Sequence, residues 1–190
     1  MAMKEKQHKK QKYRFKQVEC EHPKLEWSEL TPEAERRRRE KHRTKVDKKR
    51  NSVEKQRRRA ERMAGEGRWA GTAQMAASMM EAQRLLEGSE FEKKVADETD
   101  ARWTSIEFHC PDCGLHGDID VVTSDGTAKE CKAGGQAVDQ LKKNIVAAAI
   151  IFPGAAVHLA VPASQAQAAQ ASYRNSGNGD LVTGDKLQRH

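Results

Sequence analysis

Four charged residues lie close together in the middle of the chain, in a pattern that could bind a metal ion. They belong to the stretch GDIDVVTSDGTAKECKAGG, and they are Asp118, Asp120, Glu130 and Lys132. Charges on apolar strands are costly unless they face water or a metal. Hard divalent cations such as Mg²⁺ bind carboxylates together with substrate phosphates, and such an ion can bridge a scissile phosphate and activate a water. A neighbouring lysine can orient that water or stabilise developing charge.

The stretch predicts a β-hairpin, whose turn decides where these charges lie. Side chains alternate along a strand, so the two aspartates share one face of their strand, and Glu130 shares a face with Lys132. A two-residue turn would send the two pairs to opposite faces and mix charged with apolar residues. A three-residue loop at residues 124–126 instead sets Asp120 opposite Glu130 and gathers all the charges, so we adopt this register. The residues expected to point together into the core are Ile119, Val121 and Cys131. A surface salt-bridge ladder is the alternative role for the charges.

The chain before the hairpin predicts helices. Thr31-Pro32-Glu33 is typical of a helix start, and an almost entirely charged helix or partly disordered arm is expected from there to about residue 64. Glycines between residues 65 and 71 predict a hinge. A helical apolar stripe follows until Gly88, after which Ser89 to Glu92 forms a capping-box pattern that restarts a helix.

The rest of the chain predicts a sheet between helices. Strands are expected at residues 103–108, 117–123, 127–132 and 157–161, with a last short strand at Leu181, and helices at residues 136–152 and 164–173. The order of helix, three strands, helix and strand predicts an α/β fold, in which a mixed sheet is covered by helices on both faces. His158, inside an apolar strand, is expected to be structural.

The positive charge of the chain is concentrated in its first part. The 190 residues carry a net charge of +7, and residues 1–70 hold 24 Lys and Arg against 12 Asp and Glu, whereas residues 71–190 hold 11 against 16. A basic segment before a slightly acidic domain of residues 72–190 predicts a polyanion partner such as nucleic acid. The candidate nucleic-acid-binding residues are Arg36, Arg37, Arg38, Arg39, Lys48, Lys49, Arg50, Arg57, Arg58 and Arg59.

The chain shows no targeting or membrane-spanning segment. The N-terminal residues lack the apolar core of a secretory signal. The longest unbroken apolar run, residues 145–152, is far shorter than the ~20 residues that a bilayer needs. We therefore expect a cytoplasmic protein without a membrane span.

The hairpin motif resembles that of a known nuclease superfamily. Gly117 to Val122, a short turn and then Glu130-Cys131-Lys132 are similar to the motif of the PD-(D/E)XK restriction-endonuclease-like nucleases, and the resemblance covers about residues 88–162. It implies an αβββαβ core and hydrolysis of phosphodiester bonds with Mg²⁺ or Mn²⁺. DNA is favoured over RNA as the substrate, although the same fold serves both polymers.

The resemblance also implies roles for individual residues. Asp120 would be the motif aspartate, Glu130 the second metal ligand and Lys132 the catalytic lysine, with the carbonyl of Cys131 as a third ligand. Asp118 adds a further carboxylate to the metal set. Members of the superfamily often use a glutamate on the first helix, for which the matches are Glu92 and then Glu90, and Glu92 also has a local explanation as a helix cap. A glutamine that follows the lysine matches Gln136 or Gln140.

A nuclease domain behind a charged leader also resembles the toxin tips of bacterial polymorphic toxin systems. That resemblance implies delivery into a target bacterial cell by a secretion system, and a cognate immunity protein as partner. A housekeeping or phage-type nuclease is the alternative.

A second group of residues predicts a metal site of another kind. Cys110 and Cys113 belong to the stretch HCPDCG, which has the form of a zinc knuckle, but a second CxxC pair is missing. Either His116, or Cys20 and His22 together, could complete a structural Zn²⁺ site, and free thiols or a redox-sensitive pair are the alternatives. A zinc knuckle beside a basic arm also suits a different class, a nonenzymatic nucleic-acid-binding protein.

Overall fold

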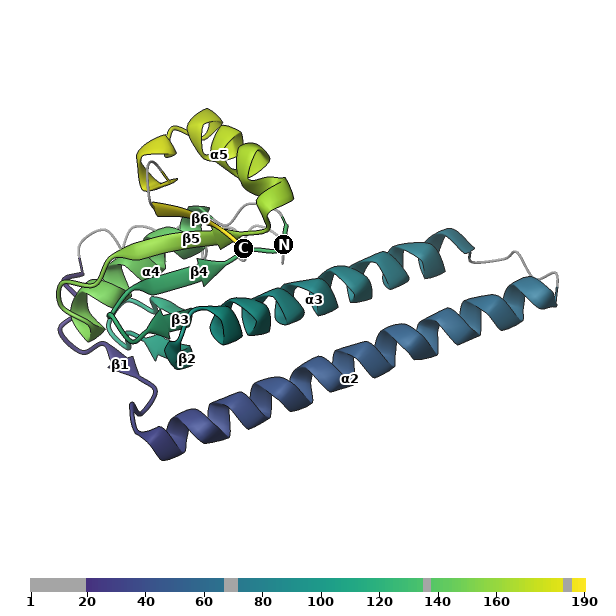
Figure 1. Cartoon of the computed structure of the whole chain (residues 1–190), viewed down its shortest axis with the longest axis horizontal. Helices are drawn as coiled ribbons and strands as arrows, with labels where there is room; N and C mark the ends of the chain where they lie inside the picture. The colour runs from purple at the N-terminus through teal and green to yellow at the C-terminus, as the bar shows by residue number, and fades with distance from the viewer. Residues whose placement is uncertain (1–19, 67–71, 135–137, 183–185) are drawn as a thin grey trace, which may run out of the picture.

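The computed structural model describes residues 20–66, 72–134, 138–182 and 186–190, which form a six-stranded sheet and four α-helices (Figure 1). The strands are β1 (Glu26–Trp27), β2 (Ala101–His109), β3 (His116–Thr123), β4 (Ala128–Cys131), β5 (Val157–Val161) and β6 (Leu187–Arg189). The helices are α2 (Pro32–Gly65), α3 (Thr72–Glu98), α4 (Val138–Ile151) and α5 (Ala166–Asn175), with short 3-10 turns η1 (Ala163–Gln165) and η2 (Gly179–Val182). None of the helices in these ranges is both long and apolar enough to cross a membrane.

The sheet is mixed and has helices on both faces. Its strand order is β1-β2-β3-β4-β5-β6, antiparallel from β1 to β4 and parallel from β4 to β6. One apolar cluster joins β2 and β3 to α4, and a second joins β5 to α4 and α5. A third joins β3, β4 and β5 to α3 on the other face. The expected α/β fold with a mixed sheet is therefore confirmed.

The last strand lies later in the chain than predicted. Leu181 belongs to η2, where its N–H donates to the carbonyl of Asn178 (3.1 Å), and the neighbouring Val182 is fully buried against α5 and β5. The apolar pair therefore fills the core from a turn, and the strand beside β5 begins at Leu187.

Helices α2 and α3 form an antiparallel pair that projects from the sheet (Figure 1). Thr31 is the N-cap of α2, as predicted, and its hydroxyl accepts a hydrogen bond from the N–H of Ala34 (3.2 Å). Each helix buries an apolar side chain, Val46 in α2 and Leu86 in α3. The predicted glycine hinge falls mainly on residues 67–71, which lie outside the described residues.

The predicted restart of a helix at Ser89 is wrong, because α3 runs unbroken through Gly88. An interior glycine costs a helix about 1 kcal/mol, and packing offsets that cost here. The Ser89 hydroxyl donates to the carbonyl of Leu85 within the same helix (3.3 Å) and accepts from Lys49 of α2 (2.5 Å). Ser89 is therefore not an N-cap, and Glu92 has no capping role.

The hairpin register follows the three-residue loop. Val121 pairs with Lys129 and Val122 with Ala128, which is the register that sets Asp120 opposite Glu130. Gly126 takes the left-handed conformation with φ +86°, as this loop requires. The preferred register is confirmed.

The side-chain faces of the hairpin differ from the expectation in one respect. Ile119 packs in the cluster with α4, whereas Val121 and Cys131 pack in the cluster with α3. Strict alternation would put Ile119 and Val121 on one face. The alternation breaks at the intervening Asp120, beside the irregular backbone of Ser105 on β2, which has φ +48°.

Residues 25–35 of the basic N-terminal segment pack against the sheet. Leu25 is buried in the cluster with β2 and β3, and β1 pairs with the end of β2. Glu35 of α2 is only 6% exposed and accepts hydrogen bonds from the backbone N–H and the hydroxyl of Thr104 (3.0 and 2.9 Å). Arg38 (2.9 Å) and Arg39 (2.7 Å) also bind this carboxylate. Burial raises the pKa of Glu35, but these hydrogen bonds outweigh it and leave the pKa lowered.

We predict that Glu35→Ala lowers the free energy of unfolding by about 2 to 3 kcal/mol, because it leaves the buried N–H of Thr104 without its partner. Urea unfolding followed by circular dichroism measures this loss. The matched control is Glu33→Ala in the same helical turn, whose ion pair with Arg37 is exposed (3.6 Å) and should matter by less than about 0.5 kcal/mol.

The same carboxylate predicts a pH dependence. Because the pKa of Glu35 is lowered in the folded state, its stabilisation is complete above the ordinary value of 4.5 and is lost as the pH falls through the lowered value. The difference between wild type and Glu35→Ala should therefore shrink on acidification. Equal stability of the two variants at neutral pH would contradict the role given to Glu35.

Candidate active site and metal centre

Strands β3 and β4 part at Asp120. Their paired residues are Val121 with Lys129 and Val122 with Ala128. Beyond these pairs no further backbone pair joins the two strands among the described residues, and the backbone N–H of Cys131 donates instead to a carboxylate oxygen of Asp120 (2.7 Å). A side chain thus takes the place of a backbone partner, and Asp120 is held between the strands at 8% exposure.

Helix α4 holds the second carboxylate of the motif. Glu130 is 1% exposed, and one of its oxygens accepts from the amide of Asn144 while the other pairs with the ammonium of Lys132. Gln140 donates to the Asn144 side-chain oxygen (3.2 Å) and to the carbonyl of Asp118 (3.4 Å). Of the two predicted glutamines, Gln140 therefore lies at the hairpin, and Gln136 lies outside the described residues.

Sequence reasoning missed Asn144, which is fully buried. Its position four residues after Gln140 puts the two amides on the same face of the helix. That spacing was the available signal, because a buried amide in an apolar helix needs a polar partner.

Gly117 makes room for the side chain of Gln140 at the start of the motif. A Cβ atom there would lie 2.7 Å from Phe108 and 2.9 Å from the side-chain nitrogen of Gln140. Any other residue at position 117 would displace one of these side chains, so the glycine at the start of the motif has a local steric reason.

The motif residues bury more negative than positive charge. Burial and the neighbouring carboxylate of Glu130 raise the pKa of Asp120 well above its ordinary value, and burial raises the pKa of Glu130 to about 7. Asp118 is exposed to solvent, and partial shielding of its carboxyl by the surrounding protein, together with the charge of Glu92, raises its pKa. Burial lowers the pKa of Lys132, but the carboxylates of Glu130 and Asp120 outweigh this effect and raise it.

Helix α3 adds a fourth carboxylate from the opposite side. Glu92 binds His42 of α2 (3.1 Å), and its charge acts on Asp118, Asp120 and Glu130. Glu90, the other candidate, instead pairs with Arg50 (2.7 Å). We call Glu92, Asp118, Asp120, Glu130 and Lys132 the carboxylate cluster.

The carboxylate cluster has the donor chemistry of a divalent-cation site. It offers several hard oxygen donors, and burial, together with the charges of neighbouring carboxylates, raises the pKa values of Asp118, Asp120 and Glu130. The ammonium of Lys132 already neutralises part of this charge at Glu130. A divalent cation would neutralise more of it.

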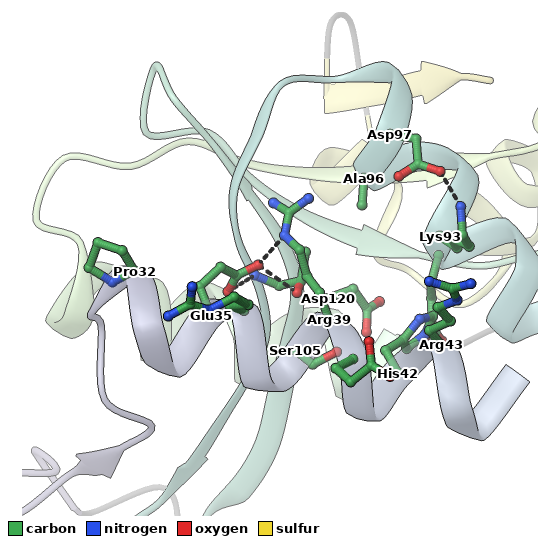
Figure 2. A pocket seen from close by; sticks show the side chains of 14 residues that line it. Pro32, Glu35, Arg39, His42, Arg43, Lys93, Ala96, Asp97, Ser105 and Asp120 are labelled. Carbon is green, nitrogen blue, oxygen red and sulfur yellow. Dashed lines mark hydrogen bonds and ion pairs between the residues drawn. The ribbon is translucent and has the colours of Figure 1, made fainter.

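A cavity of about 460 Å³ opens beside Asp120, between α2, α3 and the sheet (Figure 2). Figure 2 shows Arg39, His42 and Arg43 of α2 and Lys93 of α3 around it, with Asp120 among them. Arg36 lines the same cavity. A carboxylate that could hold a cation therefore adjoins basic groups that could hold an anion.

The predicted nucleic-acid-binding residues differ in how free their charges are. Arg38 and Arg39 bind the buried Glu35, and Arg37 pairs with Glu33. Lys49 and Arg50 bind α3, and Arg57 and Arg58 pair with Glu54. Arg36, Lys48 and Arg59 are exposed, and within the described ranges they form no ion pair.

The structure also brings together a second group of candidate metal ligands, at the turn between β2 and β3. Cys20, His22, Cys110 and Cys113 each offer one ligand atom, and these atoms all lie within 4.8 Å of one another. The four could bind a metal such as zinc. In the part of the chain that the structure describes, no other set of three or more such groups converges so tightly, the carboxylate cluster included.

Of the two predicted ways to complete a site with Cys110 and Cys113, the structure favours Cys20 and His22 over His116. Cys20 and His22 join it, whereas His116 is exposed and bonds the carbonyl of Gly114 (2.9 Å). Cys131 is buried in the α3 cluster, as expected of a residue that is not a ligand. His158 bonds Gln188 inside the fold (2.7 Å).

Comparisons with known proteins found no match for this chain. No protein-family model matches the chain, and no match is found among curated proteins or solved structures. Function is therefore inferred from the geometry and chemistry of the side chains.

Proposed function

We propose that the protein is a metal-dependent phosphodiesterase, and that DNA is its substrate. The observation that carries this proposal is the parting of β3 and β4, where Asp120, Glu130 and Lys132 come together. Buried carboxylates in excess over cations are costly unless they are paired or bind a metal, and such groups gather at functional sites. Here they adjoin a cavity with arginine side chains, which suits a substrate that carries phosphates.

The order of the elements also supports a PD-(D/E)XK nuclease. From α3 to β5 the chain runs helix, three strands, helix and strand, which is the αβββαβ order that the motif resemblance implies. The motif residues fall on the second and third of these strands, and Glu92 falls on the first helix.

Each residue of the cluster has a role in this proposal. Asp120, Glu130, Glu92 and Asp118 would hold Mg²⁺ or Mn²⁺, which when bound polarises the scissile phosphate and lowers the pKa of a bound water. Lys132 would orient the attacking water and stabilise developing charge. Through Asn144, Gln140 would hold the Glu130 carboxylate in place.

Three other proposals stay open beside DNA cleavage. RNA is an alternative substrate for the same cluster. A nonenzymatic nucleic-acid-binding protein is favoured by one observation, the cluster of three cysteines and a histidine, which could serve as its zinc staple. Delivery into a bacterial cell and a cognate immunity protein are proposals that rest on the resemblance to toxin tips.

We predict that the purified chain nicks or linearises supercoiled plasmid in Mg²⁺, and that a chelator abolishes this activity. Lys132→Ala should lower the rate by about 10²-fold or more, because it removes the charge that stabilises the transition state. Lys142→Ala is the matched control, since Lys142 is an exposed lysine of α4 outside the cluster. Agarose gel electrophoresis over a time course measures the rates.

Thermal melting must show that Lys132→Ala is folded. A folded wild type that leaves plasmid and a parallel RNA substrate intact would refute the nuclease proposal. Cleavage that survives Glu130→Ala would refute the proposed site.

The cavity generates a second prediction about the basic helix. Arg36→Gln with Arg43→Gln should lower cleavage roughly tenfold, because these side chains line the cavity beside Asp120. Arg58→Gln with Arg59→Gln, farther along the same helix, should weaken DNA binding in a salt-dependent way and alter cleavage at saturating DNA much less. Fluorescence anisotropy and single-turnover cleavage separate the two effects. Equal cleavage by both double variants at saturating DNA would contradict a phosphate site in the cavity.

A further inference from the structure

The cysteine and histidine cluster joins two segments that are far apart in the sequence. Cys20 and His22 precede β1, whereas Cys110 and Cys113 lie in the turn between β2 and β3. Cys20 and Cys110 are 90 residues apart in the chain, yet their sulfur atoms lie 3.9 Å from each other. The cluster therefore brings the segment before β1 next to the turn between β2 and β3.

The distances suit a tetrahedral metal better than direct contacts. Zn–S bonds of about 2.3 Å place two ligand sulfurs a little under 4 Å apart in a tetrahedron. The Sγ atom of Cys113 lies 3.3 Å from Nδ1 of His22, and all four ligand atoms lie within 4.8 Å of one another. The four cysteines of the chain, all within the described residues, are free, so no disulfide joins the segments.

The backbone around the sulfurs is arranged for thiolate ligands. The N–H groups of Leu115 and His22 point to the sulfurs of Cys113 (3.4 Å) and Cys20 (3.3 Å). Gly114, with φ +73°, closes the turn by donating to the carbonyl of Cys110 (2.8 Å). Such N–H to sulfur contacts orient metal ligands and stabilise their charged form.

Burial indicates a structural site. Cys110, Cys113 and His22 are 0%, 3% and 8% exposed, and the cysteines belong to the apolar cluster around Ile119. A closed site with four protein ligands leaves no position for substrate or water. Soft thiolates select zinc over magnesium or manganese, so this site and the carboxylate cluster would take different ions.

We propose that Cys20, His22, Cys110 and Cys113 bind one Zn²⁺ ion, and that this ion fastens the segment before α2 to the sheet. Besides the four ligands, that segment contacts the sheet through the buried Leu25, the two residues of β1 and an exposed ion pair of Lys24 with Asp112 (3.2 Å). Metal coordination closes a loop of about ninety residues and so contributes folding free energy.

The fastened segment leads directly to the helix that covers Asp120. Ser28 exchanges hydrogen bonds with the backbone of Glu107, and Thr31 then caps α2. Farther along α2, Glu35 binds Thr104 and His42 binds Glu92. The zinc ion would therefore fix where α2 begins, and with it the wall of the cavity. This inference does not depend on the proposed nuclease activity.

Elemental analysis of the purified full chain by mass spectrometry tests the metal. We expect about one zinc per chain, as in structural sites with four protein ligands. His22→Ala and Cys113→Ser should lower the content to near zero. His116→Ala and Cys131→Ala are the matched controls and should keep the metal, because neither side chain belongs to the cluster. Wild-type protein without zinc, or zinc that survives His22→Ala and is lost in His116→Ala, would overturn the assignment.

Two measurements on the wild-type protein, cobalt substitution and hydrogen exchange, cover the case in which a variant fails to fold. Wild-type protein stripped of zinc and loaded with Co²⁺ should show the visible absorption of tetrahedral cobalt and a thiolate charge-transfer band. An octahedral cobalt spectrum would overturn the ligand set.

Hydrogen exchange with and without a zinc-selective chelator tests the fastening role. Stripping the metal should speed exchange at residues 20–36 and leave β5 unchanged. Unchanged exchange at residues 20–36 would overturn that role. Neither measurement involves cleavage, so a failure here is distinct from a failure of the nuclease proposal.

Discussion

The hydrogen bond from the Cys131 N–H to Asp120 is the interaction on which the candidate active site depends. A buried N–H at the point where two strands separate must find a partner, and a carboxylate in that position satisfies it. The same bond fixes Asp120 beside Glu130. The two strands can then diverge without an unsatisfied backbone group, and the space that they leave is occupied by charges instead of apolar side chains. A local backbone requirement thus accounts for the position of the most buried aspartate of the motif.

Burying this much charge requires support from both faces of the sheet. On one face, Gln140 and Asn144 of α4 form a chain of amides that ends at Glu130. On the other, Glu92 projects from α3 and is itself held by His42 of α2. Helix α2 is in turn tied to the sheet by Glu35 and by the segment before β1. The pKa values of Asp118, Asp120 and Glu130 remain raised in this arrangement, and a cation bound there would relieve part of the cost of ionising them.

Local patterns predicted much of this arrangement, and long-range contacts account for what they missed. The helix start at Thr31, the strand at residues 157–161 and the three-residue hairpin loop follow from residues adjacent in sequence. The restart at Ser89 failed because the packing of α3 against α2 overrides the helix-breaking tendency of Gly88. The divided faces of Ile119 and Val121 depend on the irregularity at Ser105 of another strand. Asn144 was missed because its partner Glu130 belongs to another element, and the spacing from Gln140 was the single local signal of a polar contact.

The basic N-terminal segment shows why charge counts alone are a poor guide to a binding surface. Its composition predicts affinity for a polyanion. Arg38 and Arg39, however, form ion pairs with the buried Glu35, and these pairs hold α2 against the sheet. Among the described residues, Arg36 and Arg43 form no ion pair and line the cavity beside Asp120. An arginine that is already paired must give up its partner before it can bind a phosphate, so it contributes little to affinity. The orientation of α2 on the sheet, rather than the number of its arginines, therefore decides which charges line the cavity beside Asp120.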